Sequence, residues 1–258
     1  DSTYKSNLIS NKVTNKDGTK ILETTREYTS DGRFVASSTD ELGNKTTYDE
    51  YDAFGKIKKV TNALGAVSKF SYNSDDTLNK ILLEKGTDSV SVSYSYDSKK
   101  RLSKVTLENG SIYDFVYDSL SNIKEIKLNG TLIFAYEYEL STGNLIKQTY
   151  GTNSDAYIFE YDDNNLISKI YYQPVNGSKL LKVKYSYDEK KRITKVENGN
   201  SYLLNSYEYD QEDRVKTVKT SNSEINNSYD NLGNINAKAF KVNEQKYYSS
   251  YDTVSRSK

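Results

Sequence analysis

The chain has 258 residues, 25 of them tyrosine, and contains no cysteine, histidine, methionine or tryptophan, while its 36 basic and 36 acidic side chains balance. The lack of histidine and cysteine excludes a Ser-His-Asp triad, a thiolate nucleophile, an ordinary zinc site and a disulfide framework. The balanced, scattered charge argues against a nucleic-acid partner, and no apolar run approaches the roughly 20 residues needed for a membrane-spanning segment.

The beginning of the chain carries no clear repeat over its first 27 residues. It starts at Asp1 with neither an initiator Met nor the basic and apolar parts of a signal peptide. The other end stops shortly after it enters a new unit at Tyr251. We therefore expect the chain to be a fragment of a larger protein.

A recurring Tyr-Asp pair dominates the rest of the chain, from about residue 28 to residue 256. Its tyrosines are Tyr51, Tyr96, Tyr117, Tyr161, Tyr187, Tyr209, Tyr229 and Tyr251, with degenerate copies at Tyr72 and Tyr138. Successive copies lie 20 to 26 residues apart, a period typical of stacked supersecondary units. The spacing predicts a single repeat array over residues 1–258.

The segment that enters each copy has the pattern of a β-strand. A second aromatic residue stands two positions before the tyrosine at Phe70, Tyr94, Phe115, Tyr136, Phe159, Tyr185 and Tyr207. Residues two apart in a strand share a face, so we expect paired aromatic rings on one side of a sheet. Tyrosine must supply much of the apolar area, because aliphatic residues are scarce.

Polar and turn-forming residues follow each tyrosine, as in Asp52-Ala53-Phe54-Gly55-Lys56. This composition predicts a chain reversal in which the aspartate accepts backbone N–H bonds. Apolar residues then stand six and nine positions after the tyrosine, as Ile193 and Val196 do after Tyr187. Strict alternation would place residues three apart on opposite faces, so either both faces are partly buried or the strand contains a bulge.

Asn-Gly pairs separate several of the expected strands, at residues 109–110, 129–130, 176–177 and 198–199. Asn-Gly is the strongest short signal for a hairpin, so each period encodes two strands and two turns. We expect an all-β antiparallel meander without an amphipathic helix. Twist accumulates by roughly 20–25° per strand, which favours a twisted, spiralling ribbon; propeller blades are the main alternative.

These units resemble the YD repeats of Rhs proteins, whose pattern is Tyr-Asp-x-x-Gly-Arg-Leu followed by a second apolar position. Residues 51–57 and 229–235 resemble the pattern best, and residues 61–65 resemble the connection common between bacterial copies. The resemblance implies a β-sheet that spirals into a shell, as in insecticidal toxin complexes, bacterial polymorphic toxins and teneurins. It also implies an enclosed toxin or C-terminal payload as partner, and a secreted or cell-surface bacterial protein.

The resemblance carries over no catalytic residue, because the family's self-cleaving region after the last repeats has no matching stretch here. We expect no enzymatic activity, no cofactor and no metal. The acidic pairs Asp75-Asp76 and Asp162-Asp163 suit solvated turns better than a calcium loop or a glycosidase.

The alternative hypothesis is a cell-surface adhesion or carbohydrate-binding module, in which exposed tyrosines stack on sugar rings. Most aromatic pairs recur with the repeat, so packing explains them. Tyr171, Tyr172, Tyr247 and Tyr248 break the register and are the candidate carbohydrate contacts. An enzyme that uses carboxylates alone is the third and least supported hypothesis.

Overall fold

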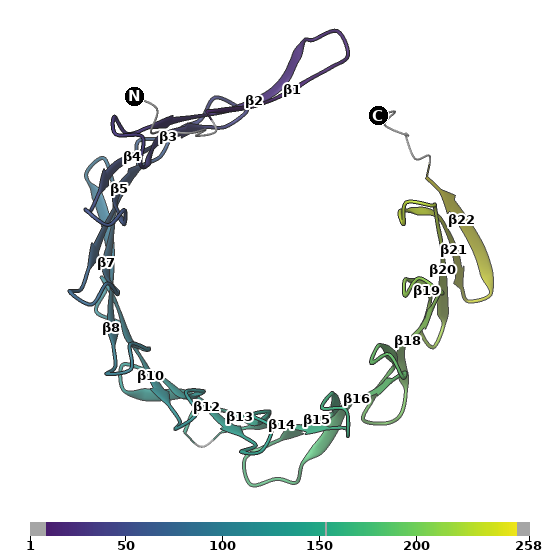
Figure 1. The fold of residues 1–258 in the computed structure, drawn as a ribbon. Helices are drawn as coiled ribbons and strands as arrows, with labels where there is room; N and C mark the ends of the chain where they lie inside the picture. Colours follow the sequence, from purple (N-terminus) through teal and green to yellow (C-terminus); the bar gives the residue numbers. More distant parts are fainter. Residues whose placement is uncertain (1–8, 153, 252–258) are drawn as a thin grey trace. The chain divides into compact units, whose positions relative to one another are not determined.

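The computed structural model describes residues 9–152 and 154–251, which form 22 β-strands and no helix (Figure 1). The expected all-β fold is confirmed. Over these residues there is also no helix long and apolar enough to span a membrane. Asp252, the second half of the last Tyr-Asp pair, lies outside the described residues.

The chain divides into two compact units, Asp1–Thr131 and Leu132–Lys258. In the first unit each strand pairs antiparallel with the next along the chain. Its strands are β1 (Ser10–Thr14), β2 (Lys20–Tyr28), β3 (Val35–Thr39), β4 (Lys45–Tyr51), β5 (Ile57–Thr61), β6 (Val67–Tyr72), β7 (Leu78–Lys85), β8 (Asp88–Tyr96), β9 (Leu102–Leu107), β10 (Ile112–Tyr117) and β11 (Ile123–Leu128).

The second unit repeats this meander, again with each strand antiparallel to the next. Its strands are β12 (Thr131–Tyr138), β13 (Leu145–Tyr150), β14 (Ala156–Tyr161), β15 (Ile167–Gln173), β16 (Leu180–Tyr187), β17 (Ile193–Asn198), β18 (Leu203–Tyr209), β19 (Val215–Lys219), β20 (Ser223–Tyr229), β21 (Ile235–Val242) and β22 (Gln245–Ser250). A single array over residues 1–258 stays a prediction.

A β-bulge follows the Tyr-Asp turns that the structure describes and resolves the three-residue spacing of the apolar positions. Between β16 and β17, Tyr187 pairs with Ile193 while Ser186 pairs with Lys195, so Thr194 is the extra residue of the bulge. Val196 then pairs with Tyr185. Ile193 and Val196 therefore lie on the face of the two tyrosines, and the bulged alternative is the correct one.

Each unit is one layer of sheet with chemically different faces. The aromatic pairs and their apolar partners share one face, which we call the aromatic face. The other face carries cross-strand ion pairs such as Lys69–Glu84 at 2.7 Å and Lys219–Glu208 at 2.7 Å. Among the described residues only Ser37, Ala156 and Thr217 are buried, because no second layer covers either face.

Candidate functional site

The Tyr-Asp turn is the element that the chain repeats, and its aspartate holds the turn closed. The Asp188 Oδ1 accepts backbone N–H bonds from Lys190 at 3.0 Å and Arg192 at 2.9 Å. The same two bonds, to residues two and four positions later, form at Asp40, Asp52, Asp97, Asp118, Asp162, Asp210 and Asp230. The predicted structural role of the aspartate is confirmed.

The tyrosine joins each repeat to the one before it. The Tyr187 hydroxyl donates to the carbonyl oxygen of Ile167, the first residue of β15, at 2.7 Å. Equivalent bonds join Tyr51 to Val35, Tyr72 to Ile57, Tyr117 to Leu102, Tyr161 to Leu145, Tyr209 to Ile193 and Tyr229 to Val215, at 2.6 to 2.9 Å. Burial raises the pKa of Tyr187. This hydroxyl bond explains why the repeat uses tyrosine where phenylalanine would supply the same ring.

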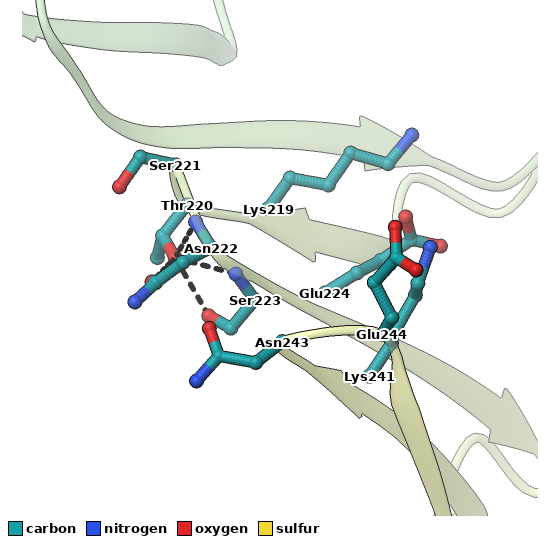
Figure 2. A pocket seen from close by; sticks show the side chains of 9 residues that line it. All are labelled: Lys219, Thr220, Ser221, Asn222, Ser223, Glu224, Lys241, Asn243 and Glu244. Carbon is teal, nitrogen blue, oxygen red and sulfur yellow. Dashed lines mark hydrogen bonds between the residues drawn. The ribbon is translucent and has the colours of Figure 1, made fainter.

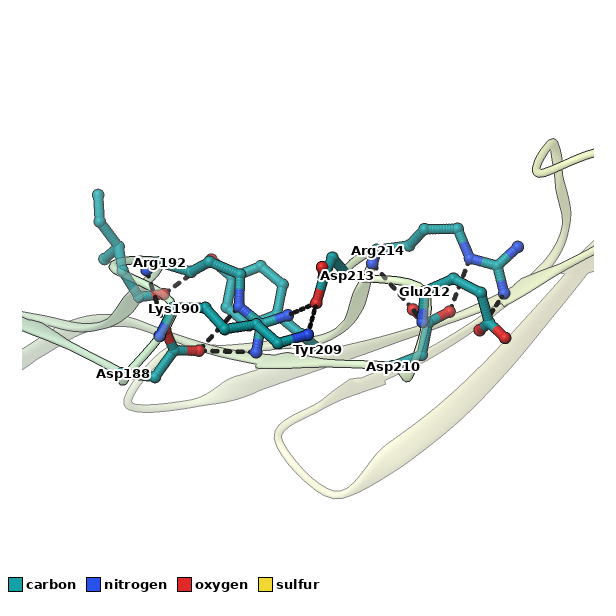
Figure 3. A network of polar contacts seen from close by, with 9 residues as sticks. Asp188, Lys190, Arg192, Tyr209, Asp210, Glu212, Asp213 and Arg214 are labelled. Carbon is teal, nitrogen blue, oxygen red and sulfur yellow. Dashed lines mark hydrogen bonds and ion pairs between the residues drawn. The ribbon is translucent and has the colours of Figure 1, made fainter.

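A cation four residues after the aspartate adds a second connection between neighbouring repeats. The Arg192 guanidinium binds the Asp188 carboxylate, lies 4.1 Å from the ring centre of Tyr209 and donates to Asp213 at 2.6 Å (Figure 3). We call this arrangement the arginine clasp. The contacts to the turn aspartate and to the next tyrosine recur, with Arg101 bound to Asp97 and 4.3 Å from the Tyr117 ring centre, and with Arg214 bound to Asp210 and 4.4 Å from the Tyr229 ring centre.

The residue four positions after the tyrosine adopts a left-handed backbone conformation, and the YD pattern has glycine at this position. Gly55 and Gly233 have φ values of 91° and 86°, but Lys100 and Lys191 stand at the same position with φ values of 60° and 64°. A side chain in this region costs about 1–2 kcal/mol, whereas glycine enters it freely.

We therefore expect Lys191→Gly to raise the free energy of unfolding by about 0.5–1 kcal/mol, part of the relieved strain being offset by the greater freedom of glycine in the unfolded chain. Urea unfolding followed by circular dichroism measures the change. The matched control is Lys184→Gly inside β16, which should be destabilising, because glycine weakens a strand interior. Equal effects of the two substitutions would contradict the assignment of strain to residue 191.

The four tyrosines predicted as carbohydrate contacts do not come together. Tyr171 and Tyr172 are neighbours in β15 and lie on opposite faces, and Tyr247 and Tyr248 do the same in β22. The Tyr171 hydroxyl donates to Glu160 at 3.0 Å, and Lys179 covers its ring at 4.2 Å. Tyr247 and Tyr248 are 53% and 78% exposed.

Tyr172 instead lines a hollow of about 650 Å³ with Tyr150, Tyr157, Ser154 and Asp155. We call it the tyrosine hollow. Its rings come from the last residue of β13, from β14 and from β15. Sequence reasoning missed Tyr150 and Tyr157, although both stand outside the aromatic positions of the repeat.

A second hollow, of about 400 Å³, lies at the turns that follow β19 and β21 (Figure 2). It is lined by polar side chains and contains no aromatic ring. The Thr220 and Ser223 hydroxyls are 2.6 Å apart, which ties the turn after β19 to the start of β20. This hydrogen bond gives residues that line the hollow a structural role in the turn.

The two acidic pairs of the sequence, Asp75-Asp76 and Asp162-Asp163, lie in the turns that follow Tyr72 and Tyr161. Asp75 accepts a hydrogen bond from the Thr77 hydroxyl at 2.7 Å, and Asp76 forms an ion pair with Lys56. Asp162 caps its own turn. Over residues 9–152 and 154–251, no group of three or more acidic side chains is placed to hold a metal ion.

Comparison with known proteins places these features in context. The family model of the teneurin YD-shell matches residues 2–182. The crystal structure of the TcdB2-TccC3 complex superposes with a TM-score of 0.70 at 13% identity, over 93% of this chain and 16% of that chain. The same complex without its hypervariable C-terminal region gives 0.67 at 14% identity, over 93% of this chain and 16% of that chain.

The Tc holotoxin pore of Photorhabdus luminescens, carrying a TccC3 mutation, superposes with a TM-score of 0.53 at 12% identity, over 94% of this chain and 18% of that chain. Comparison with curated protein sequences gives no match. The structural likenesses concern the fold, and the chain spans less than a fifth of each of these neighbours.

Proposed function

The chain belongs to the teneurin YD-shell family, and from this membership we propose that it is a wall segment of a shell that encloses or displays a toxin or other payload of a longer parent chain. Its action is steric and non-catalytic. Within each of the two units, the hydrogen-bonded ladder of paired strands keeps proteases and solvent components away from whatever lies behind it. The parent protein is secreted or exposed on a bacterial cell surface.

The observation that supports this proposal best is the single layer of sheet with an uncovered aromatic face. A globular domain of this size would bury a core, but the described residues contain three buried side chains. The rings of the repeat on β4 to β20 are instead only partly buried. A single wall, tied from repeat to repeat by tyrosine hydroxyls and arginine clasps, suits enclosure better than it suits a folded catalytic domain.

The test is limited proteolysis of the parent protein. We expect its C-terminal payload to resist trypsin while the wall is intact, and to be cut at least about tenfold faster when the wall is loosened by Tyr209→Ala. The control substitution is Tyr202→Ala, at an exposed tyrosine outside the repeat. A payload cut equally fast inside the native parent and as a separate protein would overturn the enclosure proposal.

The second candidate function is adhesion through carbohydrate binding. It is supported by the exposure of Tyr247 and Tyr248 on β22. The test is a glycan array with the folded chain and with Tyr172→Ala and Tyr247→Ala. Saturable binding to one glycan class that these substitutions abolish would favour adhesion over the shell, whereas a folded chain without glycan binding would leave the shell proposal in place.

A further inference from the structure

The tyrosine hollow contains three rings that the repeat itself does not require. None of Tyr150, Tyr157 and Tyr172 is the tyrosine of a Tyr-Asp pair or the aromatic residue two positions before it. The ring centroids of Tyr150 and Tyr157 are 5.9 Å apart, and those of Tyr157 and Tyr172 are 5.8 Å apart. A local ladder of contacting rings therefore lies on the aromatic face at this one place.

The angles between these rings determine the shape of ligand that fits among them. Adjacent planes are inclined by 75° and 56°, so the ring faces do not form one flat platform. Tyr150 and Tyr157 keep 38% and 36% of their surface exposed. Flat platforms suit sugar rings, while several inclined faces around one space suit a compact cation, because each face carries negative charge density.

The charge of the lining also favours a cation. Asp155 is the charged residue that lines the hollow, and no lysine or arginine does so. Its carboxylate is held in place by the Tyr172 hydroxyl at 2.5 Å and by the backbone N–H of Val175 at 3.1 Å. The Lys182 ammonium lies 5.2 Å from the Tyr172 ring centre but does not line the hollow.

We propose that the tyrosine hollow is a binding site for a trimethylammonium group. The methyl groups contact the three ring faces, and the positive charge lies near Asp155. A primary ammonium is more strongly hydrated and gives up water at a greater cost, so a quaternary cation is the better ligand for an aromatic lining. Such a group is found on free choline-type molecules and on trimethylated lysine side chains.

The test is a titration of the folded 258-residue chain with choline chloride, observed through the NMR signal of the choline methyl protons. We expect saturable broadening and an upfield shift. The neutral isostere 3,3-dimethylbutan-1-ol should bind about fivefold or more weakly, because it lacks the charge. A trimethyl-lysine peptide in a parallel titration shows whether a free molecule or a side chain is the tighter ligand.

Two variants connect the binding to this hollow. Asp155→Asn and Tyr157→Leu should each weaken choline binding by about fivefold or more, and Tyr202→Leu should leave it unchanged. Absence of choline binding to the folded chain would overturn the proposal. Equal affinity for choline and its neutral isostere would also overturn it, as would binding of a neutral sugar at this hollow in place of choline.

Discussion

Tyr209→Ala is expected to lower the free energy of unfolding by about 2–3 kcal/mol, and Tyr209→Phe by about 1 kcal/mol. Alanine removes a half-buried ring that lies 4.1 Å from the Arg192 guanidinium, and it also removes the hydroxyl that donates to Ile193 at 2.8 Å. Phenylalanine keeps the ring and loses the hydroxyl alone. Urea unfolding followed by circular dichroism measures both changes.

The matched control is Tyr202→Ala, because Tyr202 is 67% exposed and lies outside the repeat. We expect it to change stability by less than about 0.5 kcal/mol. Similar losses at residues 202 and 209 would show that the tyrosine of the Tyr-Asp pair has no special role in coupling repeats. If Tyr209→Phe left the free energy of unfolding unchanged, the whole loss caused by Tyr209→Ala would come from the ring.

Acid is expected to destabilise the chain, because many turns depend on ionised aspartates. The Arg192 guanidinium, together with backbone N–H groups, lowers the pKa of Asp188, and Arg101 does the same for Asp97. The pKa is also lowered at Asp40, Asp52, Asp118, Asp210 and Asp230. A carboxylate with a lower pKa in the folded state stabilises the fold above the unfolded pKa of about 4, and this stabilisation is lost as pH falls through the folded pKa.

The thermal unfolding midpoint should therefore stay level from pH 7 to about pH 5 and fall between about pH 4 and pH 2. The control carries Asp97→Asn, Asp188→Asn and Asp210→Asn together. Asparagine can cap these turns, since Asn198 Oδ1 accepts the same two backbone bonds at 3.0 Å. The triple variant should lose less stability in acid, and an unchanged acid profile would contradict the role given to the carboxylates.

The repeat pattern was informative because its copies form the same local structure from the same types of side chain. The hydrogen bonds of the aspartate after Tyr187 could be predicted from the sequence, because an acidic side chain at the start of a turn reaches the N–H groups two and four residues later. The apolar residues at 193 and 196 signalled a bulge, although their spacing alone left two alternatives open.

The tyrosine contacts depended on neighbours distant in sequence. The Tyr187 hydroxyl finds its acceptor at Ile167, and Arg192 finds its ring at Tyr209, each in another copy of the repeat. No pattern of residues close together in the sequence indicates which carbonyl oxygen or ring of the other copy will be the partner. For Tyr171 and Tyr172, strand alternation could have predicted the opposite faces on which they lie, and their role as carbohydrate contacts stays a prediction.

By itself the sequence determined the all-β meander, the turn chemistry and the YD repeat, because these follow from side chains that act within a few residues of one another. Only the tertiary structure decided that the bulge places both apolar residues on the aromatic face, that tyrosine hydroxyls join neighbouring repeats, and that Tyr150, Tyr157 and Tyr172 surround one hollow. The register between strands brings these groups together, and register is set by bulges and turns acting along the whole meander.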